Sequence, residues 1–154
     1  MNIGRGRSRH LGQALALCAS IAAGGCGASA VRADRLERAI APTFANLVHL
    51  QLARLGLPPV AVSDLKVTAS CYRTGGGVTG AGEWVCALIW AGPNGPALHD
   101  KYDLYVAPDG CYTATADVSE AKVGGPTVKT TDGRDVRNLL YAFDGCFETT
   151  TRAE

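Results

Sequence analysis

Between residues 33 and 55 the apolar positions recur every three or four residues, which is the spacing of an amphipathic helix. Asp34, with Glu37 three residues later, resembles a capping box at its start, and Gly56 is well placed to end it. Pro42 lies in the interior, where a proline removes one backbone hydrogen bond, so we expect a kink or two helices that meet there. The apolar stripe consists of Leu36, Ile40, Phe44, Leu47 and Leu50.

From Val62 onward the apolar period changes to two, which predicts half-buried strands. The predicted strands share this alternation and occupy residues 62–72, 83–90, 101–106 and a segment that starts near Cys111. Turns rich in glycine and proline separate them, at residues 73–82, 93–96 and 108–110. A further strand candidate lies at residues 127–131, and residues 136–143 have the spacing of a short helix. The pattern predicts an α+β fold, with one long kinked helix packed on an antiparallel sheet of about four to five strands.

The strand at residues 83–90 places apolar residues on both of its faces. Trp84, Leu88 and Trp90 share the face that we expect beneath the helix. An apolar sheet face must be covered by something, and residues 135–143 are the cover that we expect for the other side. If they do not cover it, that side is a candidate binding surface for an envelope protein or a small apolar ligand. The surface would consist of Tyr72, Val85, Ala87, Ile89 and Tyr105.

Four of the six cysteines follow the N-terminal region, and an even number in an exported chain predicts two disulfides. Cys71 and Cys86 lie on consecutive predicted strands with the same parity, so antiparallel pairing brings them side by side. Cys111 and Cys146 each follow an Asp-Gly pair and form the second match. We therefore predict the disulfides Cys71–Cys86 and Cys111–Cys146. No C-x-x-C pair occurs, which disfavours a zinc site.

The N-terminus has the layout of a secretory signal, because three arginines precede an apolar run at residues 11–23. The run is shorter than the roughly 20 residues that a membrane-spanning helix needs. Cys26 follows Ala23, Gly24 and Gly25, a sequence that resembles a bacterial lipobox. We therefore expect acylation of Cys26 and a lipid anchor on the outer face of the cell membrane.

This interpretation divides the 154 residues into a signal peptide at 1–25, a tether at 26–32 and a single α+β domain at 33–149. The alternative is ordinary cleavage after Ala30, which would release a secreted protein that begins at Val31. Three of the 15 basic residues belong to the signal, which leaves 12 against 14 acidic residues and a net charge of −2. That balance does not favour nucleic-acid binding, which needs a basic face.

Candidate catalytic residues are few. His99 beside Asp100 could form an oriented pair, but adjacent strand residues point to opposite faces. His49 is expected on the polar side of the helix, and Asp109 and Asp144 each precede glycine, as turn residues do. The glycine-rich loop lacks the lysine of a phosphate-binding loop. We predict no metal, no cofactor and no catalytic site.

In order along the chain come a lipobox-like cysteine, a helix with Asp34 and Glu37, V-x-x-x-C up to Cys71, E-W-V-C up to Cys86, and a strand followed by an Asp-Gly-Cys turn. This arrangement resembles small, functionally uncharacterised lipoproteins of actinobacterial cell envelopes. The resemblance covers residues 33–106, and it implies a helix laid on an antiparallel sheet and no particular activity.

The sequence thus favours an exported cell-envelope lipoprotein with a non-enzymatic binding or structural role. Two alternatives come from other classes. One is an exported hydrolase that uses His99 or an aspartate. The other is a secreted protease-inhibitor-like module that presents the loop at residues 74–82 to an enzyme.

Overall fold

The computed structural model describes residues 31–92, 96–117, 119 and 122–149. The predicted signal peptide and Cys26 lie outside the described residues, as does most of the turn predicted at 93–96. The elements follow one another as α1 (Ala33–Leu55), η1 (Val62–Leu65), β1 (Thr68–Arg73), β2 (Gly82–Ala91), β3 (Ala97–Val106), β4 (Cys111–Ala116), β5 (Thr127–Lys129), β6 (Asp135–Arg137) and β7 (Ala142–Cys146).

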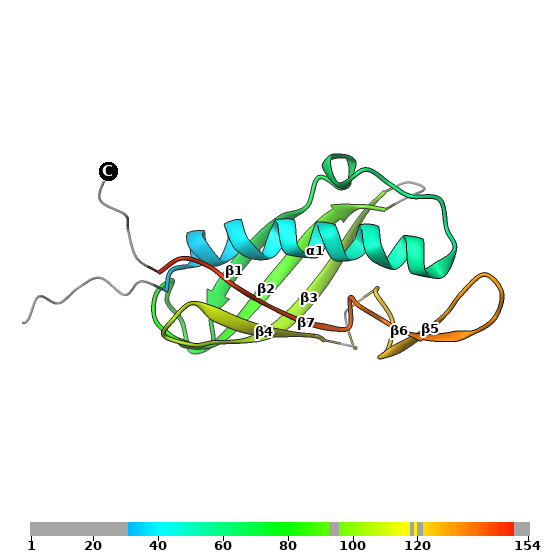
Figure 1. The fold of residues 1–154 in the computed structure, drawn as a ribbon. Helices are drawn as coiled ribbons and strands as arrows, with labels where there is room; N and C mark the ends of the chain where they lie inside the picture. The colour runs from blue at the N-terminus through cyan, green and yellow to red at the C-terminus, as the bar shows by residue number, and fades with distance from the viewer. Residues whose placement is uncertain (1–30, 93–95, 118, 120–121, 150–154) are drawn as a thin grey trace, which may run out of the picture.

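Five strands form one antiparallel sheet in the order β1-β2-β3-β4-β7, and α1 lies across one of its faces (Figure 1). Strands β5 and β6 form a separate hairpin in the connection from β4 to β7. The α+β fold predicted from the apolar periodicity is confirmed, with a five-stranded sheet and the added hairpin.

Helix α1 occupies the predicted residues and remains a single helix through the exposed Pro42, which excludes the alternative of two helices that meet there. Gly56 ends it in the left-handed conformation, with φ of 75°. The N–H groups of Gly56 and Leu57 donate to the carbonyls of Ala53 and Leu52, which is a Schellman motif.

The start of α1 differs from the predicted capping box. The N-cap is Arg32, and no side chain caps it. Asp34 lies in the first turn, where its carboxylate accepts hydrogen bonds from Arg32 at 3.0 Å and from Arg38 at 2.9 Å. These two guanidinium groups hold the pKa of Asp34 below its usual value. Glu37 turns instead toward the sheet, because β1 offers it an unpaired backbone N–H group.

The buried face of α1 is also rotated from the predicted stripe. Leu50 is 53% exposed, whereas Val48 and Leu52 are buried. The predicted stripe and the observed buried face both have residues at intervals of three and four, so periodicity alone does not decide which of them faces the sheet. The twisted sheet beneath the helix decides, and it buries Leu36, Ile40, Phe44, Ala45, Val48, Gln51 and Leu52.

The core between helix and sheet is built on Phe44. Its ring centroid lies 5.7 Å from that of Trp90 and 5.8 Å from that of Tyr102, both in edge-to-face arrangements. Phe143 packs against Tyr102 at 5.3 Å, and the Tyr102 hydroxyl donates to the Leu140 carbonyl at 2.7 Å. Trp84, which was predicted to lie beneath the helix, is buried beside this cluster, as is Leu104.

Two predicted elements are wrong. Residues 62–65 form a 3-10 turn rather than a strand, and Lys66, with φ of 47°, delays the extended chain until Thr68. The short helix expected at 136–143 is replaced by β6 and β7. The Asp132-Gly133 turn closes the β5–β6 hairpin, and residues 142–146 are extended because β7 pairs with β4. Strand pairing therefore overrides the helical spacing of the apolar residues in this segment.

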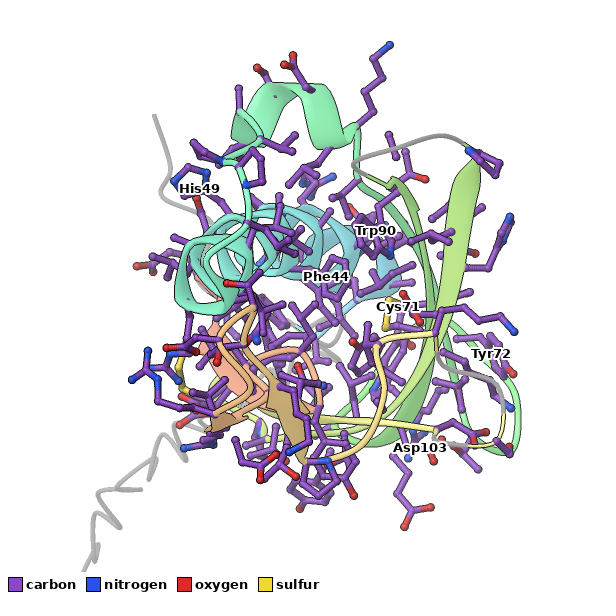
Figure 2. The ribbon with its side chains drawn as sticks, turned by 90° about the vertical axis from the view of Figure 1, so that its right-hand side faces the viewer. Phe44, His49, Cys71, Tyr72, Trp90 and Asp103 are labelled. Atoms are coloured by element: carbon purple, nitrogen blue, oxygen red, sulfur yellow. A yellow bond between two sulfur atoms is a disulfide. The ribbon has the colours of Figure 1, made fainter. Side chains whose placement is uncertain are left out.

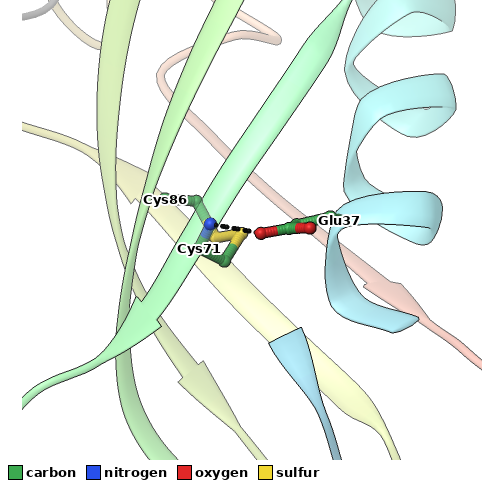
Figure 3. Close-up of a disulfide and its surroundings, with 3 residues drawn as sticks. All are labelled: Glu37, Cys71 and Cys86. Carbon is green, nitrogen blue, oxygen red and sulfur yellow. Dashed lines mark hydrogen bonds between the residues drawn. A yellow bond between two sulfur atoms is a disulfide. The ribbon is translucent and has the colours of Figure 1, made fainter. Parts of the chain in front are cut away.

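Both predicted disulfides are confirmed, and each joins directly opposed residues of neighbouring strands. Cys71–Cys86 lies on the face beneath α1, where Glu37 accepts the Cys71 N–H group at 2.8 Å (Figure 3). This N–H group points out of the edge strand rather than toward β2, so the side chain of Glu37 satisfies it. Cys111–Cys146 lies on the other face.

The folded part begins before α1. Val31 is only 1% exposed, and Arg32 pairs with Thr79 of the glycine-rich loop in an isolated antiparallel bridge. Residues 31 and 32, which we expected in the tether, therefore belong to the domain.

Candidate functional site

No element among the described residues covers the sheet face opposite α1, which corrects the expectation that residues 135–143 cover it; we call this side the open face. Strand β7 instead extends the sheet beside β4, and it turns Phe143 toward the helix side. The open face consequently leaves large side chains accessible, with Tyr72 at 52%, Tyr105 at 58% and Ile89 at 39% exposure. Figure 2 shows Tyr72 and Asp103 on the side of the sheet away from Phe44.

The register brings the predicted binding-surface residues onto this one face. Tyr72 lies opposite Val85, and Ala87 and Ile89 continue the same face of β2. Tyr105 of β3 lies opposite Glu83. The five residues chosen from sequence alternation therefore share a surface made by three neighbouring strands.

Acidic residues that the sequence analysis missed lie among these aromatic and aliphatic side chains. Asp103 lies opposite Val85, and Glu83 opposite Tyr105. Asp144 lies opposite Thr113 on the same face and belongs to β7, so its predicted role as a turn residue is wrong. The shared parity of Asp103 and Tyr105 on β3 was the sequence signal that could have found Asp103.

Two hollows flank Tyr105 on the open face. The larger has a volume of about 540 Å³ and includes Glu83, Asp103 and Thr115 in its lining. The smaller, of about 390 Å³, includes Asp144 and the Cys111–Cys146 disulfide. Tyr105 and Thr113 line both, so the phenol ring stands between two depressions that each contain carboxylate groups.

The charge of this region is one-sided. Within the described part of the chain, Glu83, Asp103 and Asp144 form no ion pair. Farther along the face, Lys101 pairs with Asp117 at 3.3 Å, and hydrogen bonds from Ser119 and Lys101 lower the pKa of Asp117. An exposed aromatic ring between carboxylates is chemically suited to a cationic group, which the ring face and the negative charges both attract.

His99 and Asp100 do not come together. His99 is exposed on the open face, whereas Asp100 is 2% exposed on the helix side. The Asp100 carboxylate accepts the indole N–H group of Trp90 at 2.7 Å and the backbone N–H group of Lys122. The Asp100 carboxylate is therefore occupied by hydrogen bonds in the core, and it does not orient the His99 imidazole.

His49 is half-buried rather than solvated, and its Nδ1 lies 2.8 Å from the Val60 carbonyl. Asp109 does play the predicted turn role, because its carboxylate accepts the N–H group of Cys111 at 3.0 Å. The glycine-rich loop joins β1 to β2 as expected. It is tied to the start of the domain by hydrogen bonds from Ala33 to Val78 and from Gly80 to Val31, both 2.9 Å.

No three His, Cys, Asp or Glu side chains of the described residues are grouped so that they could hold a metal ion. Over the same residues, no helix is both long and apolar enough to cross a membrane. The two disulfides are typical of an extracellular protein. Comparison with protein-family models, with curated proteins and with solved structures finds no match for this chain.

Proposed function

We propose that this protein is an exported, lipid-anchored binding protein without enzymatic activity, and that its open sheet face binds a partner protein through a basic surface. The observation that carries the proposal is the uncovered face itself, with exposed aromatic side chains among carboxylates. An apolar sheet face that no other element covers is typical of an interaction surface.

The chemistry of the face selects the kind of partner. The exposed Tyr105 lines both hollows, and Glu83 and Asp103 supply negative charge beside it. An arginine or lysine side chain of a partner combines a charge for these carboxylates with an aliphatic stem that packs on the neighbouring ring of Tyr72 or Tyr105. Such a contact needs no nucleophile and no base.

The anchor belongs to the same proposal. Four residues, from Gly27 to Ala30, separate the acylation site Cys26 from Val31, the first residue described in the domain. Acylation of Cys26 would hold the domain at the outer face of the membrane. The mass of intact protein extracted from membranes tests this directly. We expect a chain that begins at Cys26 and carries lipid, and a Cys26→Ser variant released into the medium, whereas an unlipidated chain beginning at Val31 would contradict the anchor.

The binding face is tested with a hexaarginine peptide as the probe, by titration at low ionic strength. The double variant Glu83→Gln/Asp103→Asn is expected to weaken binding about fivefold, and added salt should weaken it as well. The matched control Asp64→Asn/Glu148→Gln changes the net charge equally at exposed positions off the face. Equal losses in both double variants would show net charge alone at work and would contradict a site on this face.

Tyr105→Ala separates the aromatic contribution from the charges. The variant leaves Glu83 and Asp103 in place but removes the ring that lines the two hollows, so hexaarginine should bind it more weakly than it binds the wild-type protein. Unchanged affinity in this variant would remove the cation–π contact from the proposal.

A further inference from the structure

A cavity separate from the two hollows of the open face lies on the other side of the sheet, beneath the C-terminal half of α1. It has a volume of about 180 Å³ and lies between α1, the paired ends of β2 and β3, and the chain around the β5–β6 hairpin. Most of its lining is apolar, and includes Val48, Leu52, Trp90, Leu98, Val128 and Leu140.

Two buried amide side chains also line this cavity, and one of them is fully engaged. Asn138 is 2% exposed, and its Nδ2 donates to the carbonyls of Val123 at 2.7 Å and Gly125 at 2.9 Å. Its Oδ1 accepts the N–H group of Leu140 at 3.0 Å. Asn138 therefore holds the surrounding chain in place and has no remaining donor for an occupant.

Gln51 is different. It is 3% exposed, and its Oε1 accepts the N–H group of Leu139 at 2.8 Å. Its Nε2 has no hydrogen-bond partner among the described residues. The orientation of this amide is fixed, because the atom that faces the Leu139 N–H group must be the acceptor oxygen. The unpartnered group is consequently a donor.

A buried donor without a partner is costly, and the great majority of such groups in proteins are satisfied. A water molecule in a cavity is usually held by two to four polar groups, and here Asn138 is already engaged. A molecule with an apolar body and one acceptor atom matches both the lining and the free donor. An engineered apolar cavity of about 150 Å³ binds benzene, so this cavity can hold a single ring.

We propose that this cavity is a binding site for a small, uncharged, mostly apolar molecule of about the size of one ring, whose carbonyl or ether oxygen accepts a hydrogen bond from Gln51 Nε2. The site is independent of the open sheet face, since the sheet lies between the two.

Cyclohexanone and methylcyclohexane are probes of similar shape, and only the ketone carries an acceptor oxygen. Methylcyclohexane is the more hydrophobic of the two, so the test is the change in the ratio of their affinities between variants. Isotope labelling of glutamine alone isolates the side-chain amide signal of Gln51, the one glutamine in residues 31–154, and cyclohexanone should shift that signal. Gln51→Met should lower the affinity for cyclohexanone relative to methylcyclohexane about tenfold. Asn46→Met, on the exposed side of α1, should leave this ratio unchanged.

Val128→Phe provides a second variant, at a half-buried position on the short hairpin rather than in the central core. The larger side chain should fill the cavity and abolish binding of both probes while the NMR spectrum of the folded domain persists. An unchanged ratio of the two affinities in Gln51→Met would overturn the role of Gln51. Absence of binding by either probe to folded wild-type protein would overturn the site and leave a water as the partner of Nε2.

Discussion

The two faces of the five-stranded sheet are made by the same strands but differ in solvent exposure and in the side chains that they carry. On β2, Trp84 and Leu88 are buried under α1, while Ile89 on the alternate side is 39% exposed. On β3, Asp100 is engaged in the core, while the exposed His99 lies on the open face. Burial therefore restricts the residue types on the face beneath α1, whereas the other face is free to carry recognition chemistry.

Each face also carries one disulfide. Cys71 and Cys86 are 5% and 0% exposed, whereas Cys146 is exposed and Cys111 is partly so. The sequence separations are 15 and 35 residues, so the open-face disulfide closes the longer loop. Pairs of variants across the two faces therefore test which side of the sheet holds the fold together.

The largest effect is expected from removal of the inner disulfide. Cys71→Ala/Cys86→Ala loses both the loop constraint and the packing of two buried sulfur atoms, which together amount to about 4 to 6 kcal/mol of unfolding free energy. Cys111→Ala/Cys146→Ala should cost about 3 to 4 kcal/mol, mainly from its longer loop. Urea unfolding measures both. A greater loss in the open-face pair would show that loop length outweighs burial.

Accessibility gives an independent test of the same pair. Mild reductant followed by alkylation and mass spectrometry should label Cys111 and Cys146 first, because thiolate attack requires access to the sulfur. Earlier labelling of Cys71 and Cys86 would contradict their burial beneath α1.

Leu88 and Ile89 are isomers on adjacent positions of β2, so truncating each to alanine removes the same number of atoms. Leu88→Ala should lower the unfolding free energy by about 2 to 5 kcal/mol, since Leu88 is fully buried. Ile89→Ala should lower it by about 1 kcal/mol or less, as expected on a partly exposed strand face. Similar losses from the two truncations, again in urea, would mean that the second face is packed after all.

Asp100 and His99 repeat the contrast for polar residues. Asp100→Ala leaves the Trp90 indole and the Lys122 amide without their acceptor, at a cost of about 1 to 3 kcal/mol. His99→Ala should change stability by no more than about 0.5 kcal/mol. Thermal unfolding followed by circular dichroism compares them, and a large loss from His99→Ala would reveal a structural role for the histidine.

The smallest effect concerns alkaline pH. Burial, and secondarily the charge of Asp100, raises the pKa of the Tyr102 hydroxyl above its usual 10.0. Above pH 10.0 the unfolded chain binds fewer protons than the folded one, so this contribution is present below pH 10.0 and is lost as the pH rises further. Tyr102→Phe should flatten the fall in stability in this range. Part of the slope should remain, because burial also raises the pKa of Tyr112.

Alternation and spacing predicted much of the fold correctly. The periodicity of α1 and β2 and the parity of Cys71 and Cys86 rest on interactions within one element or between consecutive strands. Predictions failed where a distant segment of the chain offers a side chain a hydrogen-bond partner that the local sequence does not show. Glu37 matches a capping box in sequence, yet it bonds to Cys71 across the core because the edge strand leaves that N–H group open.

The candidate sites divide in the same way. Tyr105 was identified because its parity on β3 follows from local alternation. Glu83 joins it only through the register between β2 and β3, and Asp144 only through the placement of β7 beside β4. The cavity at Gln51 depends on three separate parts of the chain, so no local pattern could have indicated it.

The sequence by itself determined the helix, the alternation of the strands, the two disulfides and the strand residues that point away from the helix. Tertiary structure alone decided that β7 (Ala142–Cys146) extends the sheet and that β6 pairs with β5 in a separate hairpin, so that neither strand covers the second face. The physical reason is that the free energy of that segment comes from pairing with β4, more than 20 residues earlier in the chain, and from burying Phe143 under α1. Neither contribution is visible in the local spacing of its apolar residues.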